Sequence, residues 1–529
     1  MLLLIMHSGA MLKTKKPLKK FDAPSLIKYI IELETNLEAV QTNYNLLKQD
    51  YDLLIYRRFA RSAEKFLADN QLLLFTSEAE KNGPDKNPKQ AEEFEVVKSH
   101  KRKKKGRKPI NPNIPREQKI LDIDESEKTC ACGAKLVEIG RESSEKLHIV
   151  PPRLYVEETI RLKYACRNCE GTEDEGKPTV RIAPVKPSII PRSIASPSLL
   201  SYIVVQKFED HLPYYRQEKQ FDRIGVTISR QDMSNWQQQA YEKIKPIFGL
   251  LKDELKSGPV IQMDETTVQV MGEKDRKDTQ KSYMWLTRGG PLGKPVTIYE
   301  YRETRSGQHA KEILKGYSGY LQTDGYPGYD RAVEGNNSII HAGCFAHSRR
   351  KFFEAAQATE YEATAGEGIN FIKRLYAIEN KLRNKYNREE ERKKFNRIRQ
   401  LCTWRVLNDF KEWLFVQKNT VLPSSLLGRA VDYTLAQWDK LVRYRDSPYL
   451  TPDNNACENA IRPFVLGRKN WLFSKSPEGA DSSCGMYTLI QTAIRNGLEP
   501  YKYLTELFEK APYASSHEDW INLLPWNIS

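Results

Sequence analysis

The most regular hydrophobic pattern in the chain lies near its N-terminus. Apolar residues recur there at alternating steps of four and three, at Leu26, Ile30, Leu33, Leu37, Val40, Tyr44, Leu47, Tyr51 and Leu54. This spacing predicts the a/d seam of a coiled coil. An amphipathic helix packed on its own globular domain is the alternative. The regularity of the seam favours self-association through a leucine-zipper-like helix.

A different pattern, typical of β-strands, begins after Gly258. Runs rich in β-branched and aromatic residues occupy 259–270, 282–287, 295–301, 319–324 and 338–343, with a helix-like stretch at 308–314 and another helix from about residue 346. Three strands in succession, then helix, strand, helix and strand, predict an α/β domain with a mixed sheet.

Residues 196–255, just before these strands, have a helical pattern. Within them a glycine turn at Gly225 is followed by Ser229, a good N-cap residue, and by a helix presenting Arg230, Gln231 and Asn235. This order resembles a helix-turn-helix that could read bases. Ordinary packed helices joined by a glycine turn are the alternative.

Charge narrows the class of partner. Among 529 residues, 84 Lys and Arg exceed 69 Asp and Glu, which gives a net charge of +15 and favours a polyanion such as nucleic acid. Eight of the eleven residues at 98–108 are basic, within a polar segment expected to be disordered. A solvated charge run is the alternative. No opening apolar run is long enough for a signal peptide or a membrane span, so we expect a cytoplasmic protein with no membrane partner.

The cysteines suggest a metal site. Cys130 and Cys132 form one close pair, and Cys166 and Cys169 form another, with a possible hairpin between them. Four thiols in two pairs can hold one structural Zn²⁺, and four unrelated free thiols are the alternative. Cys344 and His347 make only half of a zinc site, so we expect a packing or supporting role for them.

Three carboxylates are candidates for chemistry. Asp264 lies within a predicted strand, Asp324 at the end of another, and Glu458 is four residues before Arg462, on the same face of a helix. Such groups can bind the two Mg²⁺ ions that phosphodiester chemistry uses. A turn cap at Asp324 and a surface ion pair at Glu458 are the alternatives, and the residues alone do not decide.

Together these segments resemble the transposases of the insertion sequence 66 family, nearly from end to end. The matching stretches are the heptads with 56–65, the cysteine segment ending at Cys169, 260–266, 323–326, 343–352, 458–473, 496–501 and 523–527. The resemblance implies a DDE triad on an RNase H-like fold, with Asp264, Asp324 and Glu458 as its first, second and third acidic residues.

The resemblance also implies an activity and its partners. The expected function is that of a DNA transposase, a polynucleotidyl transferase that cuts and joins DNA with two Mg²⁺ (or Mn²⁺) ions, with Zn²⁺ as a structural ion. Expected partners are the element's terminal repeats, target DNA, a second copy through the coiled coil, and small accessory proteins, at the bacterial nucleoid. Candidate DNA contacts are Lys101, Arg102, Lys103, Lys104, Lys105, Arg107, Lys108, Arg230, Arg462, Arg468 and Lys469.

Spacing then predicts the domain order. The 134 residues from Asp324 to Glu458 exceed what a bare core needs, so a helical insertion is expected, including a basic stretch at 381–399. The predicted parts are a basic tail (1–24), a coiled coil (25–76), a basic linker (77–118), a zinc ribbon (119–192), a helical DNA-binding segment (193–256), the RNase H-like core (257–348 and 451–490), the insertion (349–450) and a helical tail (491–529).

Two other functions stay open. One is a metal-dependent nuclease or resolvase that cuts without joining. The other is a transposase-derived DNA-binding protein without catalysis. Asn459 keeps the second open, because arginine is expected after the glutamate in this family.

Overall fold

A computed structural model describes residues 23–59, 154–165, 180–358, 362–386 and 388–528, in two compact units. In the smaller unit, β1 (Lys163–Ala165) pairs antiparallel with β2 (Val180–Ile182), and the Arg161 side chain donates to the carbonyl of Ala183. The larger unit contains residues 23–59 and 186–528 and carries the three candidate carboxylates.

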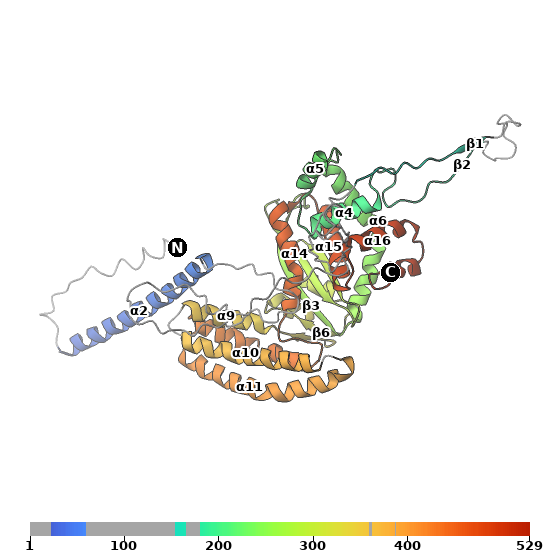
Figure 1. The fold of residues 1–529 in the computed structure, drawn as a ribbon. Coiled ribbons are helices and arrows are strands. Elements are labelled where there is room, and N and C mark those ends of the chain that lie inside the picture. Colours follow the sequence, from blue (N-terminus) through green and yellow to red (C-terminus); the bar gives the residue numbers. More distant parts are fainter. Residues whose placement is uncertain (1–22, 60–153, 166–179, 359–361, 387, 529) are drawn as a thin grey trace, which may run out of the picture. The chain divides into compact units, whose positions relative to one another are not determined.

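The larger unit is built around a mixed sheet with the order β5–β4–β3–β6–β7 (Figure 1). Its strands are β3 (Val260–Val270), β4 (Lys281–Gly289), β5 (Val296–Arg302), β6 (Gly319–Gln322) and β7 (Ile339–Ala342). β3, β4 and β5 form an antiparallel meander, whereas β6 and β7 run parallel to β3. The short β8 (Phe473–Ser474) pairs with the far end of β3. The predicted mixed α/β class is therefore confirmed.

Short helices make the parallel connections. α7 (Gly307–Ile313) joins β5 to β6, and α8 (Pro327–Val333) joins β6 to β7. Ser306 caps α7 by accepting from the backbone N–H of Gln308, at 3.2 Å. Because β6 is followed at once by the turn into α8, Asp324 lies at the edge of the sheet beside β3.

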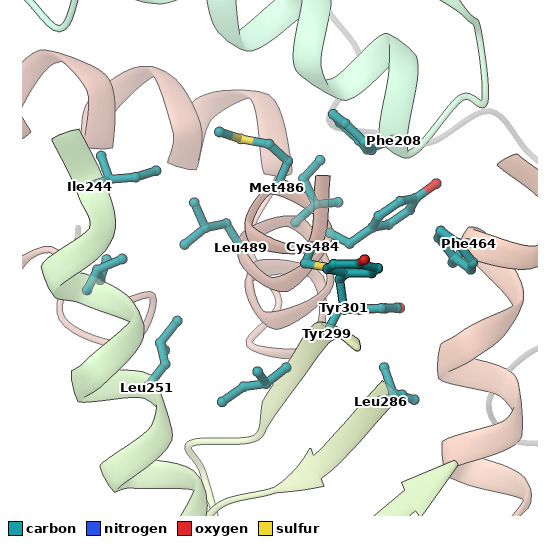
Figure 2. Packing of buried hydrophobic residues seen from close by; sticks show 14 of the residues in the cluster. Phe208, Ile244, Leu251, Leu286, Tyr299, Tyr301, Phe464, Cys484, Met486 and Leu489 are labelled. Carbon is teal, nitrogen blue, oxygen red and sulfur yellow. The ribbon is translucent and has the colours of Figure 1, made fainter. Parts of the chain in front are cut away.

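Long helices cover the sheet and enclose the main hydrophobic core. They are α4 (Pro197–Phe208), α6 (Arg230–Ser257), α14 (Asn455–Trp471), α15 (Pro477–Arg495) and α16 (Pro500–Lys510), with the shorter α17 (His517–Asn522). Figure 2 shows Cys484, Met486 and Leu489 of α15 among residues of α6, β5 and α14. The hydroxyl of Thr488 accepts from the backbone N–H of Tyr299 at 3.0 Å, which fastens α15 to β5.

The predicted helix-turn-helix segment is α5 (Tyr214–Arg223), a turn at Gly225, and α6. Gly225 has φ +82°, a conformation that glycine adopts without strain. α6 runs for 28 residues, and most of it packs into the main core through residues such as Ile244 and Leu251. Its first turns present polar side chains, including Arg230, to solvent, and its later turns also carry exposed polar residues such as Lys243 and Asp253.

The segment of the chain that follows β7 and precedes α14 forms a second, separate hydrophobic cluster. It is formed by α9 (Phe345–Ala358), α10 (Glu362–Lys385), α11 (Arg392–Thr420), α12 (Leu426–Ala436) and α13 (Trp438–Val442). In Figure 1 these helices form a layer beside the sheet. We call them the helical insertion.

The basic stretch at 381–399, for which a solvated helix face and phosphate contact were the two interpretations, is divided between two helices. α10 ends at Lys385, and a 3-10 turn at Glu389–Glu391 precedes α11. Arg399 is fully buried, and its guanidinium lies 3.2 Å from Glu379 and 3.0 Å from the carbonyl of Leu450. Arg399 therefore forms an internal ion pair with Glu379, and its buried guanidinium cannot contact phosphate.

The predicted seam lies on α2 (Ala23–Phe59). Leu53 is buried in the cluster of the helical insertion, Gln49 accepts from the backbone N–H of Leu426, and Asp50 pairs with Arg429 at 2.7 Å. The seam residues do not take part in these contacts. Leu37 and Leu47, for example, are 68% and 67% exposed to solvent. In the described part of the chain, no helix combines the length and the apolar character that a membrane span requires.

Candidate catalytic site

Asp264 is the innermost of the three carboxylates. It lies in the middle of β3, opposite Leu286 of β4 and two residues beyond the segment paired with β6. Burial raises its pKa to about 8, with further increases from the charges of Glu265, Glu458 and Asp324. The charges of Asp324 and Glu458 therefore act on Asp264. The ligand atoms of these three described carboxylates do not all lie within 4.8 Å of one another.

Asp324 is held by the turn that follows β6. Its Oδ1 accepts from the backbone N–H of Tyr326 at 3.0 Å, and its Oδ2 lies 3.9 Å from Nη2 of Arg305. The side chain is 25% exposed. The turn-capping role that the sequence left open is therefore present, and it orients the Asp324 carboxylate.

Glu458 is contributed by the first turn of α14, which packs directly on β3. Asn454, at the start of this helix, donates from Nδ2 to the carbonyl of Met263 at 3.0 Å. Its backbone N–H reaches Sγ of Cys344 at 3.2 Å. These two bonds fix the beginning of α14 against the residue that precedes Asp264.

A buried amide network ties the three segments together. Gln262 of β3 donates to Gln322 of β6 at 2.9 Å, and Gln322 donates to the carbonyl of Thr451 at 2.6 Å. Arg288 of β4 donates to Gln262 at 2.8 Å. Such satisfied buried networks fix geometry, so the strands and the approach to α14 are held in one arrangement.

A fourth carboxylate, Glu265, was not predicted from the sequence. It points to the other side of β3 from Asp264 and is bonded by the Arg305 guanidinium and the Tyr329 hydroxyl. Burial raises the pKa of Glu265. The Arg305 side chain also stacks 3.9 Å from the centroid of the Tyr326 ring. Arg305 thus joins Glu265 to Asp324, and the adjacency of Glu265 to Asp264 was the only signal in the sequence.

The helical insertion contributes two nitrogen-bearing side chains close to Glu458, those of Arg350 and His347. Nη2 of Arg350 lies 3.6 Å from Oε2 of Glu458, and Nδ1 of His347 lies 3.7 Å from Oε1. Burial lowers the pKa of His347, against the opposing effect of Glu458. Cys344, which the sequence paired with His347, is buried beside them. His347 of α9 and Cys344, which directly precedes α9, therefore both lie beside Glu458.

The predicted DNA-contact residues divide into two groups. Arg230 on α6, and Arg462 and Lys469 on α14, are exposed. Arg468 is half-buried, and its Nη1 donates to Thr267 at 3.0 Å and to Thr266 at 3.3 Å. It therefore fastens α14 to β3.

Other predicted sites lie outside the described residues. These are the basic residues of 98–108 and the zinc cysteines Cys130, Cys132, Cys166 and Cys169. The β1–β2 pair flanks the segment that contains Cys166 and Cys169.

Comparisons with known families cover most of the chain. The profile of the "Transposase IS66 family" matches residues 192–482, and that of the "zinc-finger binding domain of transposase IS66" matches 127–170. The "IS66 C-terminal element" matches 488–526, and the "Transposase C of IS166 homeodomain" matches 46–118.

Two relatives come from Sinorhizobium fredii. The uncharacterized protein y4jD is 31% identical over 427 residues, which are 78% of this chain and 80% of that protein. The uncharacterized protein y4hP is 30% identical over 452 residues, 81% of this chain and 78% of that protein. The matched profiles confirm the resemblance drawn from the sequence, and the chain belongs to the IS66 transposase family.

Proposed function

We propose that the chain is a DNA transposase that binds the ends of an insertion sequence and catalyses metal-dependent strand cleavage and strand transfer. The observation that carries the proposal is the placement of the three carboxylates. Asp264 lies in the middle of β3, Asp324 in the turn after the neighbouring strand β6, and Glu458 in the first turn of the helix that packs on β3. The charges of Asp324 and Glu458 also raise the pKa of Asp264. A packed protein gathers three carboxylates in one place at a cost, because each disfavours ionisation of the others. A bound cation offsets that cost.

The sheet supports an RNase H-like core. An antiparallel meander extended on one side by two parallel strands, with β3 at the junction, is the arrangement expected of that fold. It puts Asp264 on the central strand and Asp324 at the end of the neighbouring one, where open sheets commonly bind ligands.

The residues present suit divalent metal ions. Carboxylate oxygens are the ligands that Mg²⁺ and Mn²⁺ prefer, and Oε1 of Glu458 is buried without a hydrogen-bond partner among the described residues. Asp264, Asp324 and Glu458 would hold the ions. When bound, two such ions activate the attacking water or 3′-OH and stabilise the leaving oxygen of the phosphodiester.

The chain's own residues orient this site. Arg305 holds Glu265 and Asp324, and Arg468 and Asn454 fix α14 on β3. Exposed cations at Arg350, Arg462 and Lys469 would position the DNA backbone by charge. No covalent bond between enzyme and DNA is needed.

DNA end binding and pairing are assigned to other parts of the chain. The zinc-finger and IS66-associated N-terminal profiles support the cysteine ribbon and the basic linker as DNA-binding parts. The exposed seam of α2 supports pairing of two copies. One face of the helix contacts the helical insertion, while the described seam residues, such as Leu37 and Leu47, are exposed.

A joining assay tests the proposal. Purified full-length protein is incubated with Mg²⁺, labelled element-end DNA and a target duplex, and cleaved and joined products are separated. We expect both products with the wild type and neither with Asp264→Asn, although end binding persists. Asp253→Asn, at an exposed carboxylate of α6, is the matched control and should cleave and join normally.

The same assay separates the alternatives. Cleavage without joining would indicate a nuclease or resolvase, and binding without either product would indicate a DNA-binding protein that has lost catalysis, as Asn459 could imply. Joining by Asp264→Asn at the wild-type rate would contradict the assignment of the triad.

A further inference from the structure

A group of metal-ligand side chains overlaps the triad but is chemically different from it. Cys344 lies directly before α9, His347 lies in the first turn of α9, and Glu458 lies in the first turn of α14. One ligand atom of each lies within 4.8 Å of those of the other two. Among the described residues this is the one group of three or more His, Cys, Asp or Glu side chains with that geometry.

Two of these atoms lack partners. Nδ1 of His347 and Oε1 of Glu458 are both buried, and neither has a hydrogen-bond partner in the described part of the chain. They are 3.7 Å apart, which is too long for a hydrogen bond. Two ligand atoms about 2.1 Å from one cation are separated by about 3.4–3.6 Å at angles of about 110–120°. The observed spacing is therefore close to that of two ligands of one ion.

The third ligand determines which ion fits. Sγ of Cys344 is buried and accepts the backbone N–H of Asn454 at 3.2 Å, a bond that also stabilises a thiolate. Sulfur and nitrogen ligands suit Zn²⁺, whereas Mg²⁺ prefers oxygen alone. Because His347 and Glu458 are each about one quarter exposed, water can occupy a fourth position.

We propose that Cys344, His347 and Glu458 form a Zn²⁺ site, distinct from the cysteine ribbon, with water as the fourth ligand. Binding releases the thiol proton of Cys344 to solvent, and the remaining bonds to the ion are coordinate bonds. Glu458 cannot serve this ion and the Mg²⁺ pair at the same time. If the proposed function holds, Zn²⁺ therefore competes with Mg²⁺ and inhibits joining.

Zinc counting tests the site without reference to activity. Full-length wild type and variants are dialysed against buffered free Zn²⁺, and bound zinc per protomer is measured by mass spectrometry. We expect Cys344→Ser, His347→Asn and Glu458→Gln each to hold about one zinc fewer than the wild type. Replacement by Co²⁺ should give a thiolate charge-transfer band that is weaker in Cys344→Ser than in the wild type.

Matched controls make the count decisive. Cys402→Ser, at an exposed cysteine of α11, should retain the wild-type zinc content. Asp264→Asn should also retain it, because Asp264 is not a ligand of this site; failure of the proposed function is thus distinguished from failure of the zinc site. If Cys344→Ser is unfolded by circular dichroism, His347→Asn and Glu458→Gln still decide. Equal zinc in the wild type and in folded ligand variants would overturn the proposal.

Discussion

The two hydrophobic clusters that meet at the candidate site contribute opposite kinds of groups. The sheet cluster, with β3 and α14, supplies Asp264 and Glu458, and the turn after β6 supplies Asp324. The helical insertion, whose core is separate, supplies His347 and Arg350 from α9. The carboxylates proposed to hold Mg²⁺ thus come from one side. Arg350, a proposed phosphate contact, and His347, a proposed zinc ligand, come from the other.

The insertion lies between the second and third carboxylates of the predicted triad in the sequence. α9 begins directly after β7, and the chain returns through residues 450–454 to α14. Cys344 and Asn454, at the two ends of the insertion, are bonded to each other at 3.2 Å. The insertion is therefore closed at its base beside Glu458, and its position can affect the site directly.

The largest expected effect comes from removing a ligand on the sheet side. Asp324→Asn should lower the rate of joining by about 1,000-fold or more, because a neutral amide binds a divalent ion weakly while the fold is retained. The joining assay measures this. Asp432→Asn, at a partly exposed position of α12, is the matched control from the insertion side and should stay near the wild-type rate. Equal losses of joining rate in the two variants would contradict a specific role of Asp324 in metal binding.

DNA affinity is expected to depend on a region outside both clusters. Replacing the eight basic residues of 98–108 by glutamine should reduce the slope of log affinity against log salt by up to about 7. Fluorescence anisotropy with end DNA between 50 and 200 mM salt (about the range in which such slopes are measured) gives the value. An unchanged slope would assign the affinity to the helical insertion and the core instead.

A smaller effect is expected from the insertion side of the site. Arg350→Gln should lower joining by about tenfold by removing a phosphate-directed charge, and should strengthen Mg²⁺ binding by a few-fold by removing a competing cation beside Glu458. Titration of Mg²⁺ in the joining assay reports both values. Half-maximal joining at a lower Mg²⁺ concentration, without any loss of joining rate, would show that Arg350 only competes with Mg²⁺ for Glu458 and does not contact phosphate.

The smallest effect concerns stability. Because the pKa of Asp264 is raised to about 8, the folded protein keeps this proton to a higher pH than the unfolded chain does. Stability without Mg²⁺ should therefore fall as pH rises from about 4 to 8. Melting temperatures over this range should fall less steeply in Asp264→Asn, and Mg²⁺ should raise the wild-type value at pH 8 more than that of the variant. The same dependence of melting temperature on pH in the wild type and in Asp264→Asn would contradict a raised pKa at Asp264.

Much of the sheet could be predicted from the sequence because β-favouring runs and glycine turns are local signals. The runs around Asp264 and before Asp324 correspond to β3 and β6 within a few residues. The mixed sheet and the family were confirmed. The third carboxylate depended on the resemblance, since a Glu–Arg pair at four residues' spacing is common on surface helices.

What could not be predicted depends on contacts between distant residues. Nothing local shows that His347 meets Glu458, since the whole insertion separates them in sequence. The burial of Arg399 against Glu379 was equally hidden, because a basic run looks the same whether its charges face solvent or an internal partner. The function of Arg468 as a tether to Thr266 and Thr267 required the position of α14 on β3.

The central claim is that carboxylates from β3, β6 and α14 jointly bind divalent cations. Calorimetric titration of Mn²⁺ into the full-length protein, without added Zn²⁺, tests it most directly. We expect saturable binding in the wild type and in Asp253→Asn, and at least a tenfold loss of affinity in each of Asp264→Asn, Asp324→Asn and Glu458→Gln (about 1.4 kcal/mol). Unchanged Mn²⁺ affinity in any of the three folded variants would contradict a shared metal site.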